Sequence, residues 1–133
     1  MAFKRVGSLS GSQNPFEYYL GTDAEAYTLG EALVQTNGRL TKCGATATPE
    51  FICMKTQAAE ATAKTPLPVE RVKEDVEYST QSMATVAATL IGAKVTLHTD
   101  GLLTTATTAS GVFEISATDG AATTSNIKGY FRR

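Results

Sequence analysis

The amino-acid sequence predicts a mainly β domain, a small sandwich or barrel of short antiparallel strands with little helix. Turn dipeptides that favour hairpins, namely Asn37-Gly38, Asp100-Gly101 and Asp119-Gly120, separate short strand-like runs. Threonine and alanine dominate the 133 residues, with 21 and 19 copies. Threonine favours strands because its branched Cβ suits a pleated surface. Many short strands with turns between them are typical of a sandwich or a small barrel.

The first 28 residues are predicted to form an extended arm ahead of a single β-rich domain over residues 29–133. Gly7, Gly11 and Gly21, together with Asn14-Pro15, interrupt any regular element there. The arm nevertheless contains large side chains that need a covering surface, and these are the candidate interface residues. They are Phe3, Phe16, Tyr18, Tyr19 and Leu20. Two arrangements remain open: the arm binds a partner, or it wraps its own domain.

About eight short strands are expected within the domain. They cover residues 32–36, 39–43, 51–54, 67–73, 75–80, 94–99, 112–117 and 127–133. The first two form the clearest hairpin, because Asn37 and Gly38 readily adopt the positive φ that both turn positions need. The apolar run over residues 51–54 is typical of a short buried strand.

The segments between these strands are less regular. Residues 56–64 could form one or two helical turns or a loop, because they lack an apolar face. A bulge near Lys73-Glu74 would restore the alternation between the neighbouring strands. A short helix is possible over residues 86–91, and residues 120–126 are expected to be an exposed loop.

The sequence offers little support for catalysis, and we expect that the chain is not an enzyme. His98 is the one histidine, and its place between Leu97 and Thr99 in an alternating strand points it to solvent or to an interface. A histidine base needs a positioned nucleophile, and no nucleophile-elbow or phosphate-binding glycine motif is present. No catalytic residue and no cofactor are therefore assigned.

The cysteines and acidic residues do not predict a metal site. Cys43 and Cys53 are ten positions apart and lack neighbouring ligands. They could face each other across a hairpin that turns near Thr48, where a disulfide is geometrically possible. The favoured interpretation is two reduced, buried thiols. The acidic run Glu70, Glu74, Asp75 and Glu77 alternates with Arg71 and Lys73, which predicts a solvated strand face.

Charge and hydropathy disfavour nucleic-acid and membrane partners. The net charge is −1 and the isoelectric point is about 5.8, so there is no long-range attraction for phosphate backbones. No apolar run approaches the roughly 18 residues of a membrane span. The basic residues near the start are not followed by the apolar stretch of a secretory signal, so synthesis in the cytosol is expected.

Three segments resemble the head decoration (cement) proteins of tailed bacteriophages. Residues 30–43 (GEALVQTNGRLTKC) resemble their opening hairpin, residues 46–53 (TATPEFIC) lead into an alanine-rich segment, and residues 68–72 (PVERV) resemble the strand that follows. The resemblance implies a structural virion protein, made in the host cytoplasm, that binds the capsid exterior between major-capsid subunits and stabilises the expanded head. It also implies a homotrimer whose N-terminal arm reaches onto the capsid or a neighbour.

Two other functions remain open. A tail-tube or head-closure subunit would carry a long loop that pairs with the next subunit, and residues 120–126 are short for that role. A glycan-binding or host-surface module would present exposed aromatic residues. The second half of the chain offers Phe113, Tyr130 and Phe131 for this purpose, and tryptophan is absent.

Overall fold

The computed structural model describes residues 3–10 and 15–132, and over these residues the chain forms two antiparallel sheets of five strands each. The elements are β1 (Lys4–Ser8), β2 (Phe16–Tyr19), β3 (Ala32–Thr36), β4 (Arg39–Lys42), β5 (Phe51–Cys53), β6 (Leu67–Arg71), β7 (Val76–Gln81), the 3-10 helix η1 (Ala88–Leu90), β8 (Lys94–Val95), β9 (Phe113–Thr118) and β10 (Asn126–Phe131). The predicted mainly β class with little helix is confirmed, and the two sheets are consistent with a small sandwich.

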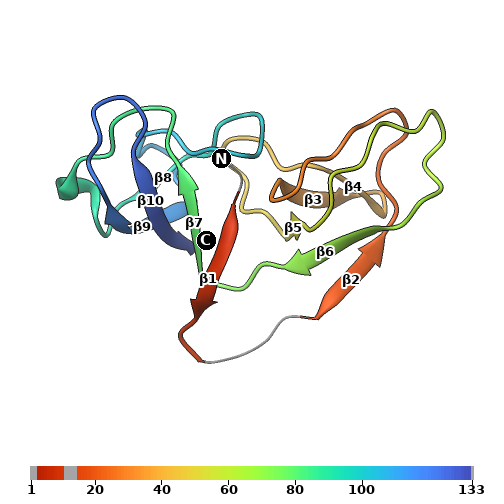
Figure 1. The fold of residues 1–133 in the computed structure, drawn as a ribbon, viewed down its shortest axis with the longest axis horizontal. Helices are drawn as coiled ribbons and strands as arrows, with labels where there is room; N and C mark the ends of the chain where they lie inside the picture. Colours follow the sequence, from red (N-terminus) through yellow and green to blue (C-terminus); the bar gives the residue numbers. More distant parts are fainter. Residues whose placement is uncertain (1–2, 11–14, 133) are drawn as a thin grey trace.

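Two chain segments pass together from one sheet to the other. The first sheet has the order β1-β7-β10-β9-β8, and the second has the order β2-β6-β5-β3-β4. β1 is followed by β2, and β6 is followed by β7, while β1 pairs with β7 and β2 pairs with β6. In Figure 1 the two pairs diverge from the lower part of the view, β1 and β7 to one sheet and β2 and β6 to the other. The N-terminal segment therefore supplies one edge strand to each sheet.

The local turn chemistry forms the hairpin that the sequence predicts. β3 and β4 pair from Leu33 opposite Lys42 to Thr36 opposite Arg39. Asn37 and Gly38 between them have φ values of 52° and 77°. Both lie in the left-handed region, as a tight two-residue hairpin requires.

Two expected elements differ in the structure, and residues 56–64 adopt the loop that was one of their two open alternatives. The turn between β6 and β7 contains Lys73-Glu74, so these residues carry the chain between sheets and do not form a bulge within one strand. Residues 56–64 form a loop with one isolated bridge, from Gln57 to Tyr27. The strand expected over residues 94–99 ends at Val95, because the next amides find successive partners: Thr96 donates to Thr107 O, and Leu97 donates to Ala45 O.

The buried side chains form two clusters. The larger one is built around four rings from three parts of the chain, Phe3, Tyr78, Phe113 and Phe131, with Phe131 centroids 4.9 to 5.3 Å from the other three. The smaller one lies in the second sheet and includes Phe51. Phe3, a candidate interface residue from its position in the arm, is 3% exposed and belongs to the core of its own domain. Its side chain is therefore not available to a partner.

One strand glycine is required by close packing of the backbone. Gly129 lies in β10 where the register with β9 shifts, and a Cβ there would lie 2.1 Å from the Glu114 carbonyl oxygen. Gly7 in β1 is the control position for comparison with Gly129, because a Cβ there would have no atom within 4 Å. The two glycines thus differ in steric demand although both lie in strands of one sheet.

We predict that Gly129→Ala lowers the free energy of unfolding by about 2 kcal/mol, because the strands must separate to admit the methyl group. Gly7→Ala is expected to change it by less than about 0.5 kcal/mol. Urea unfolding followed by circular dichroism measures both values. Equal effects of the two substitutions would contradict the register of β9 and β10.

Candidate functional site

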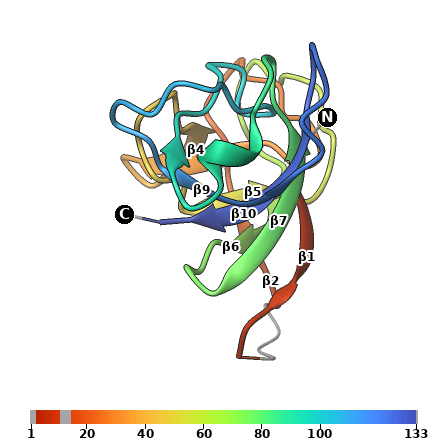
Figure 2. The same cartoon turned by 90° about the vertical axis from the view of Figure 1, so that its left-hand side faces the viewer.

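The exposed apolar side chains of the N-terminal segment lie along two open sheet edges. β1 ends the first sheet and β2 ends the second, so each has a strand neighbour on one side. Val6, Leu9, Phe16 and Tyr18 on this segment are between 47% and 71% exposed, and we call them the edge residues. Figure 2 shows β1 and β2 extending below the body of the sheets. Open edges and exposed apolar side chains are features of surfaces that bind other chains.

Strand alternation divides the aromatic residues of β2 between a partner surface and the domain itself. Phe16 and Tyr18 are exposed, whereas Tyr19 is half-buried and packs against Phe51 with ring centroids 5.3 Å apart. Leu20, directly after the strand, is also half-buried. Of the five predicted interface residues, the structure therefore leaves Phe16 and Tyr18 available to a partner.

A bidentate ion pair holds β2 on β6. Arg71 donates from Nε and Nη2 to the two carboxylate oxygens of Glu17, at 2.9 Å each. The guanidinium lowers the pKa of the Glu17 carboxyl, and a hydrogen bond from Tyr19 lowers it further. The guanidinium also lies 4.9 Å from the centre of the Phe51 ring. These contacts keep the backbone of β2 in place while Phe16 and Tyr18 face outward.

Val6 and Leu9 are functional candidates that the sequence analysis missed. The pairing of β1 with β7 shifts between Arg5 and Gly7, which leaves Val6 without an opposite residue at a bulge. A bulge changes the face to which a side chain points. In the sequence, Gly7 directly after Val6 could have indicated this bulge, since glycine within a strand-like run often marks a bulge.

A cleft of about 480 Å³ lies beside β1, between the two sheets. Its apolar wall includes Leu29, Ile52 and Met54. The polar wall contains Arg5 and Glu70, with 3.2 Å between Arg5 Nε and Glu70 Oε1. The prediction of a solvated acidic face is wrong for Glu70, whose side chain is 6% exposed, because β6 turns it toward β1.

Tyr78 from β7 completes the polar wall of the cleft. Burial raises the pKa of its phenol, and the nearby Glu70 carboxylate raises it further. The phenol therefore stays neutral at physiological pH. Arg5, Glu70 and Tyr78 come from β1, β6 and β7. The ion pair between Arg5 and Glu70 therefore connects the two sheets where they diverge.

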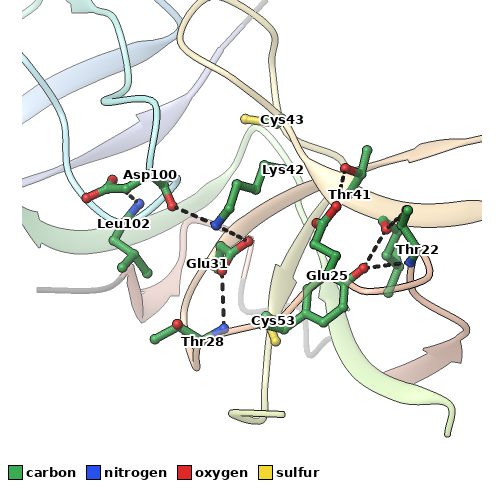
Figure 3. Close-up of polar contacts among 12 residues, drawn as sticks. Thr22, Glu25, Thr28, Glu31, Thr41, Lys42, Cys43, Cys53, Asp100 and Leu102 are labelled. Atoms are coloured by element: carbon green, nitrogen blue, oxygen red, sulfur yellow. Dashed lines mark hydrogen bonds and ion pairs between the residues drawn. The ribbon is translucent and has the colours of Figure 1, made fainter. Parts of the chain in front are cut away.

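A second buried carboxylate, Glu31, lies directly before β3 in the second sheet (Figure 3). Glu31 is 1% exposed, and its Oε2 lies 3.0 Å from Lys42 Nζ. Its Oε1 accepts a hydrogen bond from the Thr28 amide, while Lys42 also donates to the Asp100 carbonyl at 3.4 Å. Burial raises the pKa of the Glu31 carboxyl, and Lys42 opposes that shift.

The Glu31–Lys42 pair lies where the Asp100-Gly101 turn contacts the β3–β4 hairpin. Ala32 donates its amide to Gly101 O at 2.8 Å, and a Cβ on Gly101 would lie 3.1 Å from Glu31 Cγ. Gly101 has a φ of +74°, so both the backbone angle and the close contact favour glycine here. The arrangement is that of a structural joint, with the lysine compensating the buried charge.

The histidine and cysteine side chains do not assemble into a reactive site. His98 Nδ1 lies 3.2 Å from Asp100 Oδ1 at the same turn. Cys43 and Cys53 are both buried and free, in different core clusters. Burial raises the pKa of Cys43 to about 12 and that of Cys53 to about 11, which makes both poor nucleophiles.

Across the described ranges 3–10 and 15–132, no group of three or more histidine, cysteine or acidic residues could hold a metal ion. No helix in that part of the chain has the length and apolar character to cross a membrane. Comparisons of the chain with protein-family models, with curated proteins and with solved structures find no match.

We predict that Lys42→Met lowers the free energy of unfolding by about 2 kcal/mol at neutral pH, because it leaves the Glu31 carboxylate buried without a counter-charge. Lys64→Met is the matched control at an exposed loop position. Urea unfolding at pH 7 measures both. The role of the pair would be refuted if the two variants behaved alike.

The raised pKa of Glu31 predicts a pH dependence with a definite sign. A carboxyl whose folded-state pKa exceeds its ordinary value of 4.5 contributes stability below pH 4.5 that is lost as pH rises through the folded-state pKa. The stability of the unmodified chain relative to Glu31→Gln is therefore expected to fall as pH rises above 4.5. Urea unfolding of both proteins between pH 4 and pH 7 tests this.

Glu60 provides the control of opposite sign. Hydrogen bonds from Thr65 and Lys64 lower its pKa, so Glu60→Gln removes stability that is present above pH 4.5 and lost as pH falls. If Glu31→Gln and Glu60→Gln showed the same pH trend, the assignment for Glu31 would be wrong.

Proposed function

We propose that the chain is a structural, non-catalytic virion protein that binds the exterior of a tailed-bacteriophage capsid between major-capsid subunits and stabilises the expanded head. The observation that carries the proposal is the row of exposed apolar side chains, Val6, Leu9, Phe16 and Tyr18, on two open sheet edges. The resemblance of residues 30–80 to head decoration proteins indicates the capsid as the partner.

Binding would combine backbone pairing with burial of the edge residues. An extended segment of the capsid can add to the free side of β1 or β2, since strand addition uses backbone groups that an edge strand leaves exposed. Phe16 and Tyr18 would fill apolar pockets beside that segment, and aromatic anchors of this kind often dominate interface energies. The ion pair of Glu17 with Arg71 holds β2 in place before binding, which reduces the ordering cost.

A symmetric shell would multiply weak individual contacts. If each copy bridges two or more capsid subunits, the second contact forms at a high effective concentration. A trimer placed on a three-fold position would repeat the same contacts three times. In this proposal the stabilisation arises from bridging, and it needs no cofactor, metal or covalent step.

We predict that the full chain co-sediments with expanded heads of its parent virus and not with unexpanded heads. The double variant Phe16→Ser/Tyr18→Ser is expected to weaken that binding at least about tenfold, because two exposed aromatic anchors are removed. Sedimentation at a series of protein concentrations, with quantification of the pellet, measures the affinity.

Met83→Ser/Ile91→Ser is the matched control, because Met83 and Ile91 are 49% and 50% exposed but lie outside the N-terminal segment. It should bind like the unmodified chain, and circular dichroism should show that both variants fold. Absence of binding to expanded heads would refute the capsid proposal. Equal losses in both variants would refute the assignment to the edge residues.

A further inference from the structure

The outer face of the first sheet carries a hollow whose lining includes none of the edge residues. It measures about 400 Å³ and lies across β1, β7, β10 and β9, which Figure 2 shows together. The side chains used in the argument below are Lys4, Ser79, Gln81, Asp119, Asn126 and Lys128. None of them belongs to the core clusters.

Two lysines flank one serine across three neighbouring strands. In the strand register Ser79 of β7 lies opposite Lys4 of β1 on one side and opposite Lys128 of β10 on the other. Directly opposed residues project to the same face, so both ammonium groups rise from the face that Ser79 occupies. Adjacent strands are about 4.8 Å apart, which places the two lysine backbones about 10 Å from each other. A bound anion above Ser79 would be within reach of both lysines.

Neither lysine is neutralised within the described part of the chain. Both are exposed, and the ion pairs among residues 3–10 and 15–132 use other cations. Two like charges in one row of a sheet repel each other unless an anion lies between them. The part of the hollow above Ser79 is therefore electrostatically suited to a negatively charged group, whereas the Asp119 carboxylate lines the part near Asn126.

A chain of amide groups lies one step further along the same face. Gln81 donates to Asn126 Oδ1 at 3.0 Å, and Asn126 Nδ2 donates to Asp119 Oδ2 at 2.8 Å. Amides from Ala121 and Asn126 lower the pKa of the Asp119 carboxyl, which keeps it an acceptor. Each side-chain amide has two donors, so this chain leaves one N–H on Gln81, one on Asn126 and the Gln81 carbonyl oriented by the network. Such groups match hydroxyls and acetamido groups.

A separate, smaller groove lies toward a tyrosine at the other end of the face. It measures about 150 Å³ and is lined by Gly7, Ser8, Glu77, Tyr130 and the edge residue Leu9. Tyr130 is two residues beyond Lys128 on β10 and lies opposite Glu77. Glu77 accepts a hydrogen bond from Ser116 at 2.7 Å, which fixes its carboxylate. The distance along β10 from Asn126 to Tyr130 is about 13 Å at the rise of a strand, so the face is longer than a simple anion requires.

From this arrangement we propose that the outer face of the first sheet binds an acidic oligosaccharide. A carboxylated sugar unit lies over Ser79 between Lys4 and Lys128, and its hydroxyls bond to Gln81 and Asn126. A neutral unit lies toward Tyr130 and Glu77, where the Glu77 carboxylate would repel a second carboxylate and the Arg132 guanidinium already lies 4.9 Å from the centre of the Tyr130 ring. Alternation of acidic and neutral units is therefore the preferred ligand pattern. The inference does not rest on capsid binding, because the lysines and amides that carry it are not edge residues.

Isothermal titration of the full chain tests the proposal with three probes. They are a hexasaccharide of alternating glucuronate and N-acetylglucosamine, a hexamer of N-acetylglucosamine, and inorganic phosphate. We expect saturable binding of the acidic hexasaccharide that weakens as salt is raised, and at least about tenfold weaker binding of the neutral hexamer. Phosphate at millimolar concentration should not displace the acidic hexasaccharide.

Substitutions locate the site. Lys128→Gln on a central strand is expected to weaken binding about tenfold, since a charge-assisted hydrogen bond is lost, and Gln81→Ala to weaken it by a smaller factor. Lys64→Gln removes an equally exposed charge elsewhere and should leave affinity unchanged. The proposal is overturned by absent binding, by equal affinity for the neutral hexamer, by displacement with phosphate, or by equal losses in Lys128→Gln and Lys64→Gln.

Discussion

The N-terminal segment pairs with residues 67–81 in both sheets, and the rest of the architecture depends on that pairing. β1 pairs with β7 in the first sheet, and β2 pairs with β6 in the second. The two antiparallel segments therefore pass between the sheets together, and this shared crossing determines how the sheets diverge. The crossing also places Arg5 next to the buried Glu70, and a charge pair removed from water is tolerated only when both partners are held in place. Because β1 and β2 are the last strands on their side, the same pairing creates the open edges that the proposed function uses.

The two buried carboxylates have related structural roles at different joints. Glu70 connects strands of the two sheets beside the cleft, and Glu31 fixes the Asp100-Gly101 turn on the hairpin. In each case a basic residue from another strand compensates the charge, Arg5 of β1 for Glu70 and Lys42 of β4 for Glu31. Breaking such a pair costs more than the pair contributes, because a lone charge then remains in the interior.

Local patterns in the sequence predicted the elements that depend on local chemistry. The hairpin at Asn37-Gly38 and the buried strand at residues 51–54 follow from turn preference and hydrophobicity, and the structure contains both. The burial of Glu70 and the end of β8 at Val95 depend on contacts with distant segments, which alternation cannot reveal. For the candidate site, aromatic content identified Phe16 and Tyr18, while Val6 required knowledge of the bulge. The sequence could not predict that Lys4 and Lys128 flank the hollow, because they lie near opposite ends of the chain.

The edge of a sheet offers unpaired backbone groups to a partner, whereas the face of a sheet offers side chains. In this chain the edge residues and the lysines of the hollow lie on these two different kinds of surface. Val6, Leu9, Phe16 and Tyr18 lie where backbone groups are unpaired, so the proposed extended protein segment would satisfy both kinds of group. The uncompensated lysines and oriented amides lie on a face whose backbone is already paired, so a ligand there binds through side chains alone. A chain held on a surface by β2 would keep β7 and β10 accessible, whereas a partner along β1 would lie beside Lys4 and Leu9, which line the hollow and the smaller groove. Substitutions at Phe16 and Tyr18 and at Lys128 therefore test the two proposed interactions separately.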